Sequence, residues 1–531
     1  MSGTPGTERT IGKVRSAAEA AALIPSQATV LVDGSGGGVN EPDLVLRAIE
    51  ERFLAEGRPQ DLTVLHPSGM GDHLGGGIDH FAHAGLVRRV IGGHWGWCDR
   101  MQAMARDEQI EAYCLPQGVI SHLMRAIAGK RPGVITHIGL GTFVDPRLDG
   151  GRLNRRAEEP LVELIQLDGR EWLFYRSFPI HVAIIRGTAA DEAGNVTMDQ
   201  EGLFAETLSA AQAAKNSAGI VIAQVKYLAR SGSLDPRRVK VPGVLVDAVV
   251  VHPKQALSSE VTEDPALWGE LRVPVQSIPP LALSERKVIA RRAAQELRQG
   301  DIVNLGFGMP DGVAAVLAEE HQDGAVTFTL EQGHFGGVPA AGINFGLARN
   351  QDAMIDAGYQ FDWYDGGGLD VAVLSFAQVD AAGDVNVGKF GGRIPGVGGF
   401  INISQGARRV VFIGTLVAGK CAFDFGHRGL EVRADGTTLK FVPRVEQVSF
   451  SAAYARRWGQ PVAYITERAV FELTEAGIEL VEVAPGVDLE RDVLARMGFR
   501  PRISPNLRRM EVRLFLPEPM GLELIKTEAA Q

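Results

Sequence analysis

The chain has 531 residues, of which 45% are hydrophobic and 22% are charged, and its formal net charge at pH 7 is −10. These proportions are typical of a folded globular protein, and the length exceeds what one core normally supports, so two lobes are expected. Without a basic stripe or an apolar run of about 20 residues, the chain is not expected to bind nucleic acid or to span a membrane. Its polar start, MSGTPGTERTIGKVR, lacks the apolar core of a secretory signal, so we expect a cytoplasmic protein.

Only three cysteines are present, and none of them forms a CxxC pair: Cys98, Cys114 and Cys421. An odd and scattered set argues against a disulfide framework and against structural zinc, and it suits a reducing compartment. We expect all three to be buried thiols.

A weak internal repeat organises the chain. Two strand-like runs, each followed by a glycine loop and a helical stretch, surround Gly34 and Gly306. A second matched pair, VAIIRGTAADEAGNVTM and VAVLSFAQVDAAGDVNV, starts at Val182 and at Val371, with an Asp and a Gly in step. Such self-similarity predicts two lobes of related fold.

The alternation of short elements predicts the fold class. Val- and Ile-rich runs such as GIVIAQV alternate with amphipathic stretches such as ERKVIARRAAQEL, which is the pattern of βαβ units on mostly parallel sheets. The matched segments lie farther apart in the first half, so extra residues are expected between His66 and Asp149. Prolines and weak periodicity mark residues 266–284 as a linker. We predict an α/β protein with an N-terminal lobe at 1–265 and a C-terminal lobe at 285–524.

The extra region of the first half contains a histidine cluster, HPSGMGDHLGGGIDHFAHAG, that runs from His66 past His83. Its spacing matches no established metal-binding set, so we expect no metal here. Together with GGHWGWCDR, this glycine-rich stretch is expected to form loops near the active-site cleft. Trp95 and Trp97 could serve packing alone or could shape a pocket for an acid.

The densest functional signal is TLEQGHFGGVPAAGINFG at residues 329–346, where Glu331 ends an apolar run and enters a glycine-rich bend. Strand ends are where α/β proteins place their sites, and glycines let the backbone approach a bulky ligand. An isolated Glu before a Gly is also what a solvated surface turn looks like, so the motif does not decide the function by itself.

This segment resembles the active-site segment of family I coenzyme A transferases, in the single-chain branch that contains acetate and propionate CoA-transferases. The similarity covers nearly the whole chain. It continues through the segments LPQGVISHLMRAIAGKRPGVITHIGLGTFVDPR, AQAAKNSAGIVIAQVK, FDWYDGGGLD, FAQVDAAGDVNVGKF, GVGGFINISQGA, ITERAVFEL and APGVDLERDV. The resemblance implies ping-pong transfer of CoA between a short-chain acyl-CoA and a free carboxylic acid. Glu331 would be the nucleophile, CoA a co-substrate, and neither cofactor nor metal would be needed; homo-oligomers, commonly tetramers, are implied as well.

The same resemblance implies further site residues. In GVGGF, Gly398 and Gly399 would form an oxyanion hole and Gly396 would contact CoA, although this glycine run could also be a plain turn before a helix. The loop LGFGMPDG follows a strand and opens a helix, so Gly306 and Gly308 are candidate CoA contacts. Its twin at residues 34–38 is expected on the side of the carboxylic acid.

One segment nearly matches a motif that is typical of another class of protein, the NTPases. GTLVAGKC at residues 414–421 fits a phosphate-binding loop except that Cys421 replaces the Ser or Thr that holds magnesium, so the NTPase interpretation fails there. Lys420 remains as a contact for the CoA phosphates or as a solvated surface lysine. The sequence is also compatible with an acyl-CoA hydrolase that uses the same Glu331, and with a non-catalytic ligand-binding regulator of similar fold.

Overall fold

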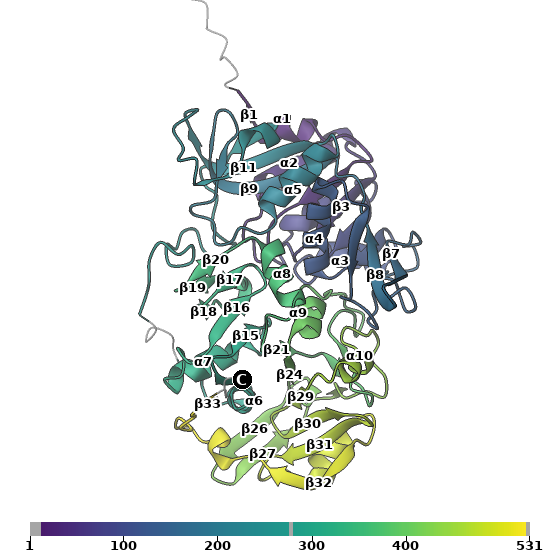
Figure 1. Cartoon of the computed structure of the whole chain (residues 1–531), viewed down its shortest axis with the longest axis vertical. Coiled ribbons are helices and arrows are strands. Elements are labelled where there is room, and N and C mark those ends of the chain that lie inside the picture. The colour runs from purple at the N-terminus through teal and green to yellow at the C-terminus, as the bar shows by residue number, and fades with distance from the viewer. Residues whose placement is uncertain (1–11, 275–279, 527–531) are drawn as a thin grey trace, which may run out of the picture.

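Two lobes, each built around one ten-stranded sheet, stand one above the other in Figure 1. The computed structural model of the protein describes residues 12–274 and 280–526. Most neighbouring strands are parallel and helices pack against them, so the predicted α/β fold with two lobes is confirmed.

The sheet of the first lobe has the order β1-β13-β11-β9-β2-β3-β4-β5, and all neighbours along this path are parallel. A small sheet of order β6-β8-β7 stands beside it. The main elements of this lobe are β1 (Val14–Arg15), α1 (Ala17–Ala22), β2 (Thr29–Val32), α2 (Asp43–Glu56), β3 (Leu62–His66), β4 (Val87–Gly92), α3 (Asp99–Arg106), β5 (Glu111–Cys114), α4 (Gln117–Ala128), β6 (Gly133–Thr136), β7 (Val162–Leu167), β8 (Arg170–Arg176), β9 (Val182–Asp191), β10 (Val196–Thr197), α5 (Thr207–Asn216), β11 (Ile220–Ala229), β12 (Val239–Val241) and β13 (Ala248–Val251).

The sheet of the second lobe has the order β20-β17-β16-β15-β21-β24-β29-β30-β31-β32, with a parallel centre from β16 to β29. The main elements are α6 (Glu285–Ala294), β15 (Ile302–Leu305), α7 (Asp311–Glu319), β16 (Thr327–Leu330), β17 (His334–Phe335), β20 (Ala353–Met354), α8 (Ala357–Asp365), β21 (Val371–Ser375), α9 (Phe400–Gly406), β24 (Arg409–Ile413), β25 (Val417–Ala418), β26 (Ala422–Gly426), β27 (Gly429–Ala434), β28 (Thr438–Leu439), α10 (Ala452–Arg457), β29 (Val462–Ile465), β30 (Ala469–Thr474), β31 (Gly477–Val483) and β32 (Arg502–Arg509).

The internal repeat is present in the strand pairing. In the first lobe β2 pairs in parallel with β9, and in the second lobe β15 pairs in parallel with β21. Val182 is opposite Val30 in the first pair, and Val371 is opposite Val303 in the second. The two segments that match in sequence therefore occupy the same place in both sheets, which confirms two lobes of related fold.

The turns that follow the matched strands are also equivalent. The Asp191 carboxylate accepts hydrogen bonds from the N–H groups of Ala193 and Asn195, at 3.0 and 2.9 Å. In the second lobe the Asp380 carboxylate accepts from Ala382 and Asp384 in the same pattern. The glycine of each turn has a positive φ, 88° at 194 and 93° at 383, which a side chain would rarely adopt. This geometry explains why Asp and Gly stand in step in the two halves.

The extra residues of the first lobe lie where the sequence predicted them. Between His66 and Asp149 the chain adds β4 and β5, which extend the parallel sheet beyond β3, together with the helices α3 and α4. At the corresponding edge of the second sheet, β16 is followed only by the short antiparallel strands β17 and β20.

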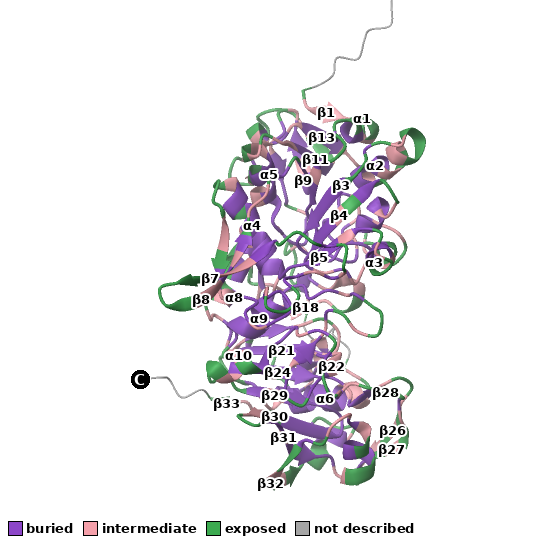
Figure 2. Ribbon diagram, turned by 90° about the vertical axis from the view of Figure 1, so that its right-hand side faces the viewer, coloured by how far each residue is buried: buried purple, intermediate pink, exposed green. Residues whose placement is uncertain are grey.

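Figure 2 shows buried residues along the central strands of both lobes and exposed ones at protruding hairpins such as β7–β8. Cys98 and Cys114 are buried as expected. Cys421 is only partly buried, because it lies just before the exposed hairpin β26–β27, so the prediction was wrong for that thiol. Among the described residues no helix is long and apolar enough to cross a membrane.

The segment between the lobes joins both of them. A small apolar cluster combines residues of the first lobe and of this segment with one residue of the second: Val39, Leu203, Ala205, Leu257, Leu267 and Leu347. The predicted linker, 266–284, includes residues 275–279, which lie outside the described part of the chain. Its exact limits, and with them the limits of the two lobes, stay predictions.

Candidate active site

Glu331 follows β16 directly, at the carboxyl end of a central parallel strand. The N–H of Gly333 donates to the carbonyl of Leu330 at 3.0 Å, and this turn directs the chain away from the sheet. Glu331 lies in a cavity of about 340 Å³ whose walls come from both lobes. The first lobe contributes Ser35, Gly36, Ser68, Gly69, His94, Trp97 and Gln117, and the second contributes, besides Glu331, chiefly Gly306, Phe307, Phe345, Ser375, Phe376, Phe390, Gly396, Gly398 and Gly399.

The GVGG loop closes one side of the cavity and is held by the first lobe. The N–H of Gly398 donates to the carbonyl of Gly93 at 2.8 Å, and the carbonyl of Gly398 accepts from the N–H of Gln117 at 2.9 Å. The N–H of Gly396 donates to Gly388 at 3.1 Å. The N–H groups of Gly396 and Gly398 therefore already donate hydrogen bonds to backbone carbonyls. In this run it is the backbone amide of Gly399 that hydrogen-bonds the Glu331 carboxylate.

Burial strongly changes the pKa of the Glu331 carboxyl. It raises the pKa of the carboxyl to about 7, while the Gly399 amide and the Gln332 side chain, whose Nε2 donates to Oε1 at 3.3 Å, pull it down. A Glu with its ordinary pKa would be fully ionised at pH 7. With its raised pKa the Glu331 carboxyl is instead partly protonated near neutral pH.

Gln117 is a site residue that the sequence did not reveal. It begins α4 in the first lobe, its side chain is buried in the cavity wall, and its Oε1 has no hydrogen-bond partner in the described part of the chain. A buried amide without a partner is unusual in a folded protein unless a ligand or water satisfies it. The only sequence signal was its place in LPQGVISHL, one of the segments that carried the family resemblance.

The predicted glycine loop between β15 and α7 is present, but only one of its two candidate CoA contacts lies at the cavity. Gly306 lines the cavity. Gly308 lies outside the lining, and its carbonyl accepts a hydrogen bond from Arg286 at 2.9 Å. Phe307, between them, contacts aromatic rings from both lobes: its ring centroid lies 5.7 Å from Trp97 and 5.3 Å from Phe345.

Comparison with known proteins decides the family. The chain is 48% identical over 523 residues to the caffeate CoA-transferase of Acetobacterium woodii, a match that covers 97% of this chain and 99% of the relative. It is 41% identical to the acetate CoA-transferase YdiF of Escherichia coli O157:H7, with 96% of each chain covered. The family described as coenzyme A transferase matches residues 14–252. The chain belongs to the coenzyme A transferase family.

The fold of this transferase agrees with a solved structure of the same family. The acyl-CoA transferase YdiF of E. coli O157:H7, determined as a thioester complex with CoA, superimposes with a TM-score of 0.93. The two chains are 40% identical, and the match covers 99% of this chain and 100% of the other. The two-lobed arrangement is thus that of a CoA-transferase, which is the class of enzyme that the sequence predicted.

In this transferase the GTLVAGKC segment is not a phosphate-binding loop. A loop of that kind needs a helix directly after it, whose free N–H groups face the phosphates. Here the segment leads from β24 into β25 and then into the hairpin β26–β27. Lys420 is exposed and is not among the residues that line the cavity.

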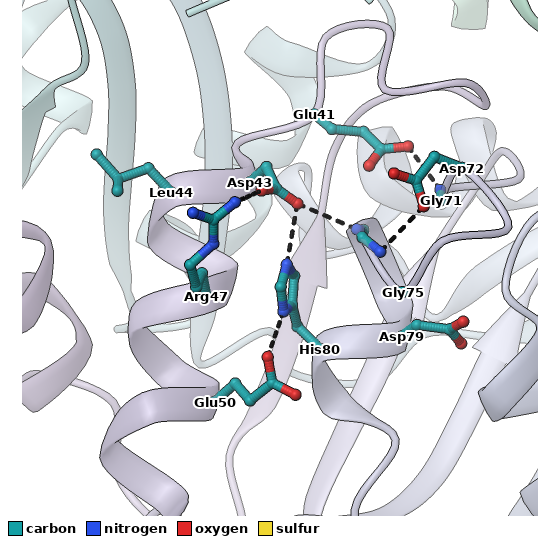
Figure 3. Close-up of polar contacts among 12 residues, drawn as sticks. Glu41, Asp43, Leu44, Arg47, Glu50, Gly71, Asp72, Gly75, Asp79 and His80 are labelled. Atoms are coloured by element: carbon teal, nitrogen blue, oxygen red, sulfur yellow. Dashed lines mark hydrogen bonds and ion pairs between the residues drawn. The ribbon is translucent and has the colours of Figure 1, made fainter. Parts of the chain in front are cut away.

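The histidine cluster is distributed over ion pairs and the core rather than gathered around one point. His80 lies between Asp43 and Glu50, with its Nε2 3.0 Å from the Asp43 carboxylate (Figure 3). His66 is fully buried, and burial lowers its pKa to about 4. His73 contacts Asp99 instead. Among the described residues no three His, Cys, Asp or Glu side chains are placed to hold a metal.

The tryptophans of the first lobe have separate roles in the structure. Trp95 is fully buried, and its backbone N–H donates to the carbonyl of Pro395 at 2.6 Å, so it packs the lobe interface. Trp97 lines the cavity, and a Cβ atom at Gly36 would lie 2.3 Å from its Nε1. The loop at 34–38 thus approaches the cavity through Gly36, and its expected place on the side of the carboxylic acid stays a prediction.

Proposed function

We propose that this transferase moves CoA between a short-chain acyl-CoA and a free carboxylic acid through a covalent thioester on Glu331. The observation that carries the proposal is the position of Glu331: it is the carboxylate in the cavity between the lobes, and the Gly399 amide acts on it. A carboxylate can attack a thioester without a separate base once it is ionised.

The proposed reaction consists of acyl exchanges only. The Glu331 carboxylate attacks the thioester carbonyl of acyl-CoA, forms a mixed anhydride and expels CoA thiolate. The thiolate then attacks the glutamyl carbonyl, which forms the enzyme thioester and releases the first acid as a carboxylate. The second acid reverses both steps and leaves as its CoA thioester. Each step exchanges one acyl bond for another, so the reaction needs no cofactor or metal.

The hydrogen bonds of the site point to one donor for the developing oxyanion. Gly399 supplies an amide that hydrogen-bonds Glu331, whereas the unpartnered atom of Gln117 from the other lobe is its Oε1, which can only accept a hydrogen bond from a ligand or water. A preorganised donor of this kind is worth about 3 kcal/mol in the transition state. Gly398, whose N–H is held by Gly93, serves to position the loop rather than to donate. This proposal replaces the glycine pair expected from the sequence.

The size of the acid is set by walls from both lobes. The cavity of about 340 Å³ is at the small end of ligand pockets, and its rings include Trp97, Phe307 and Phe345. We propose acetate, propionate and acids of similar size as substrates. The two relatives carry the names of acids as different as acetate and caffeate, so both should be tested as acceptors.

A hydrolase and a regulator would behave differently from a transferase. A hydrolase with the same nucleophile would release free CoA from acetyl-CoA without an acceptor acid, whereas the transferase requires one. A non-catalytic regulator would not need a carboxylate next to an amide donor in the cavity between the lobes. We also propose that the enzyme works in the cytoplasm as a homo-oligomer, and sedimentation of the purified protein would test its oligomeric state.

Trapping the intermediate tests the mechanism. The protein is incubated with acetyl-CoA, reduced with borohydride and mapped by peptide mass spectrometry; a glutamyl thioester at Glu331 is reduced to the alcohol there. Glu331→Gln should remove both the adduct and the exchange of label between acetyl-CoA and propionate, by a factor on the order of 10³ or more. The exposed Glu475→Gln is the matched control and should retain both. An adduct on another residue would overturn the proposal.

A further inference from the structure

His94 lines the cavity that holds Glu331, and it belongs to the first lobe. It lies between β4 and α3, and its backbone forms an antiparallel bridge with Gly396 of the GVGG loop. A Cβ atom at Gly398 would lie 3.8 Å from His94 Cβ and 3.8 Å from Glu331 Oε1. The histidine and the nucleophile are therefore neighbours of the same glycine, although they come from different lobes.

Two glycines hold the His94 ring in place. A Cβ atom at Gly69 would lie 2.4 Å from His94 Nδ1, and a Cβ atom at Gly96 would lie 2.5 Å from His94 Cε1. Neither position has room for a side chain, so the ring is packed closely against bare backbone on both segments. A ring fixed in this way is preorganised for one contact in the cavity.

A hydrogen bond determines which nitrogen of His94 carries the proton. The N–H of Gly96 donates to His94 Nδ1 at 3.2 Å. A backbone N–H can only donate, so Nδ1 is an acceptor and the neutral ring carries its proton on Nε2. His66 has the opposite arrangement, because its Nδ1 lies 2.8 Å from the carbonyl oxygen of Ser68, which can only accept.

The Nε2 of His94 is an unused hydrogen-bond donor. Burial, with repulsion from His66 and His73, lowers the pKa of His94 to about 4, so the ring is neutral at pH 7. Nε2 has no hydrogen-bond partner among the described residues, and unlike the Nε2 of His66 it is not fully enclosed by protein. His94 therefore offers one N–H to a molecule in the cavity.

The proposed reaction needs donors at two different oxygens. When Glu331 attacks the thioester, negative charge develops on the acyl oxygen of the substrate. When CoA thiolate attacks the glutamyl carbonyl, the charge develops on an oxygen of Glu331 itself. The Gly399 amide hydrogen-bonds Glu331, so it is placed for the second oxyanion. The first oxyanion requires a donor that faces the substrate.

We propose that His94 is a further catalytic residue, whose Nε2–H donates a hydrogen bond to the acyl oxygen of the substrate while Glu331 attacks the thioester. This inference rests on the proposed function. His94 keeps its proton throughout: the oxyanion collapses to the mixed anhydride and expels CoA thiolate. A neutral imidazole suits this task, because an imidazolium would pair with the Glu331 carboxylate and weaken it as a nucleophile.

His94→Asn and His94→Gln separate the two ring nitrogens. Asn reaches the place of Nδ1 and can accept from Gly96, whereas Gln reaches the place of Nε2 with an N–H. In His94→Asn we expect kcat for exchange between acetyl-CoA and propionate to fall about 10²- to 10³-fold, with KM nearly unchanged. His94→Gln should restore most of the rate. Full activity of His94→Asn, or an equal loss in both variants, would overturn the role.

His181→Asn is the matched control. The Nδ1 of this exposed histidine also accepts a backbone N–H, from Thr29 at 2.9 Å, but the residue does not line the cavity. Its replacement should leave the rate of exchange as in the wild type. A loss as large as that of His94→Asn would show that the effect is structural, and the role of His94 as a donor would be refuted.

A substrate analogue tests which oxygen His94 serves. In the dithioester analogue of acetyl-CoA the acyl oxygen is replaced by sulfur, a weak hydrogen-bond acceptor. Relative to the wild type, His94→Asn should then lose far less activity than with acetyl-CoA, whereas Gly399→Ala should lose as much with either substrate. An equal loss of His94→Asn with both substrates would contradict a bond to the acyl oxygen.

The position of the proton can be checked without catalysis. In the ¹⁵N NMR spectrum of histidine-labelled protein, the ring signals that vanish in His94→Gln belong to His94. They should show a neutral ring with its proton on Nε2 from about pH 5.5 to about pH 8.5. A proton on Nδ1, or titration within this range, would overturn the proposal. If wild-type protein forms no Glu331 adduct, the proposed function fails while this spectrum keeps its meaning.

Discussion

Gly399 and Glu331 are in such close contact that a Cβ atom at position 399 would lie 2.1 Å from Glu331 Oε2. Gly399 immediately precedes α9, whereas Glu331 follows β16, so two distant segments meet at the nucleophile. The contact allows the Gly399 amide to act on the carboxylate, and it requires a residue without a side chain.

Gly399→Ala is therefore expected to displace the Glu331 carboxylate and to remove its amide donor. We expect kcat for CoA exchange to fall by about 10²-fold or more, as when one oxyanion donor is lost. The matched control is Gly324→Ala, because nothing lies within 4 Å of a Cβ atom at that exposed position and its φ is ordinary. Steady-state exchange between acetyl-CoA and propionate measures both. Equal activity of the two variants would contradict the role of Gly399.

The pKa of Glu331, raised by burial to about 7, predicts how activity depends on pH. Only the ionised carboxylate is a nucleophile, so kcat/KM for acetyl-CoA should rise with pH and level off above about 7. Below that value it should fall about tenfold per pH unit. A profile measured from about pH 5.5 to about pH 8.5 that stays flat through neutrality would show that the carboxyl ionises at its ordinary pKa.

The same shift predicts a stability effect. Because the folded protein binds the Glu331 proton more tightly than the unfolded chain does, ionisation destabilises the fold as pH rises from about 4.5 to about 7. At about pH 8 this cost is on the order of 3 kcal/mol. Glu331→Gln removes it, so the variant should have a higher Tm than the wild type at about pH 8 and a smaller advantage at about pH 5. Glu475→Gln should show no such difference, and a Tm advantage that is the same at both pH values would refute the assignment.

Trp97 offers a test of acid selectivity. Its indole lines the cavity from the first lobe, 5.7 Å from the Phe307 ring of the second. Trp97→Ala enlarges the cavity, so the ratio of kcat/KM for caffeate over acetate should rise, by about 10- to 200-fold for a change of this kind in an apolar pocket. Trp458→Ala is the control, because that indole is exposed and lies outside the cavity. An unchanged ratio in Trp97→Ala would place selectivity elsewhere.

The sequence by itself determined the architecture, because strand and helix periods and the repeated Asp and Gly of two turns are local properties. It placed Val182 and Val371 at equivalent positions, which the parallel pairing of β9 with β2 and of β21 with β15 confirms. It also singled out Glu331, through many motifs in the order of one family. These features depend on neighbours along the chain, and the order of residues displays them directly.

Only the tertiary structure decided which groups surround Glu331. Gly398 and Gly399 look alike in the sequence, but a carbonyl of the other lobe occupies the amide of Gly398 and leaves that of Gly399 for the nucleophile. Likewise Lys420 stands in a loop-like motif, and only the structure shows that it is exposed and outside the lining of the cavity. Hydrogen-bond occupancy, burial and the resulting pKa values come from contacts between segments far apart in the chain, and no local pattern encodes them.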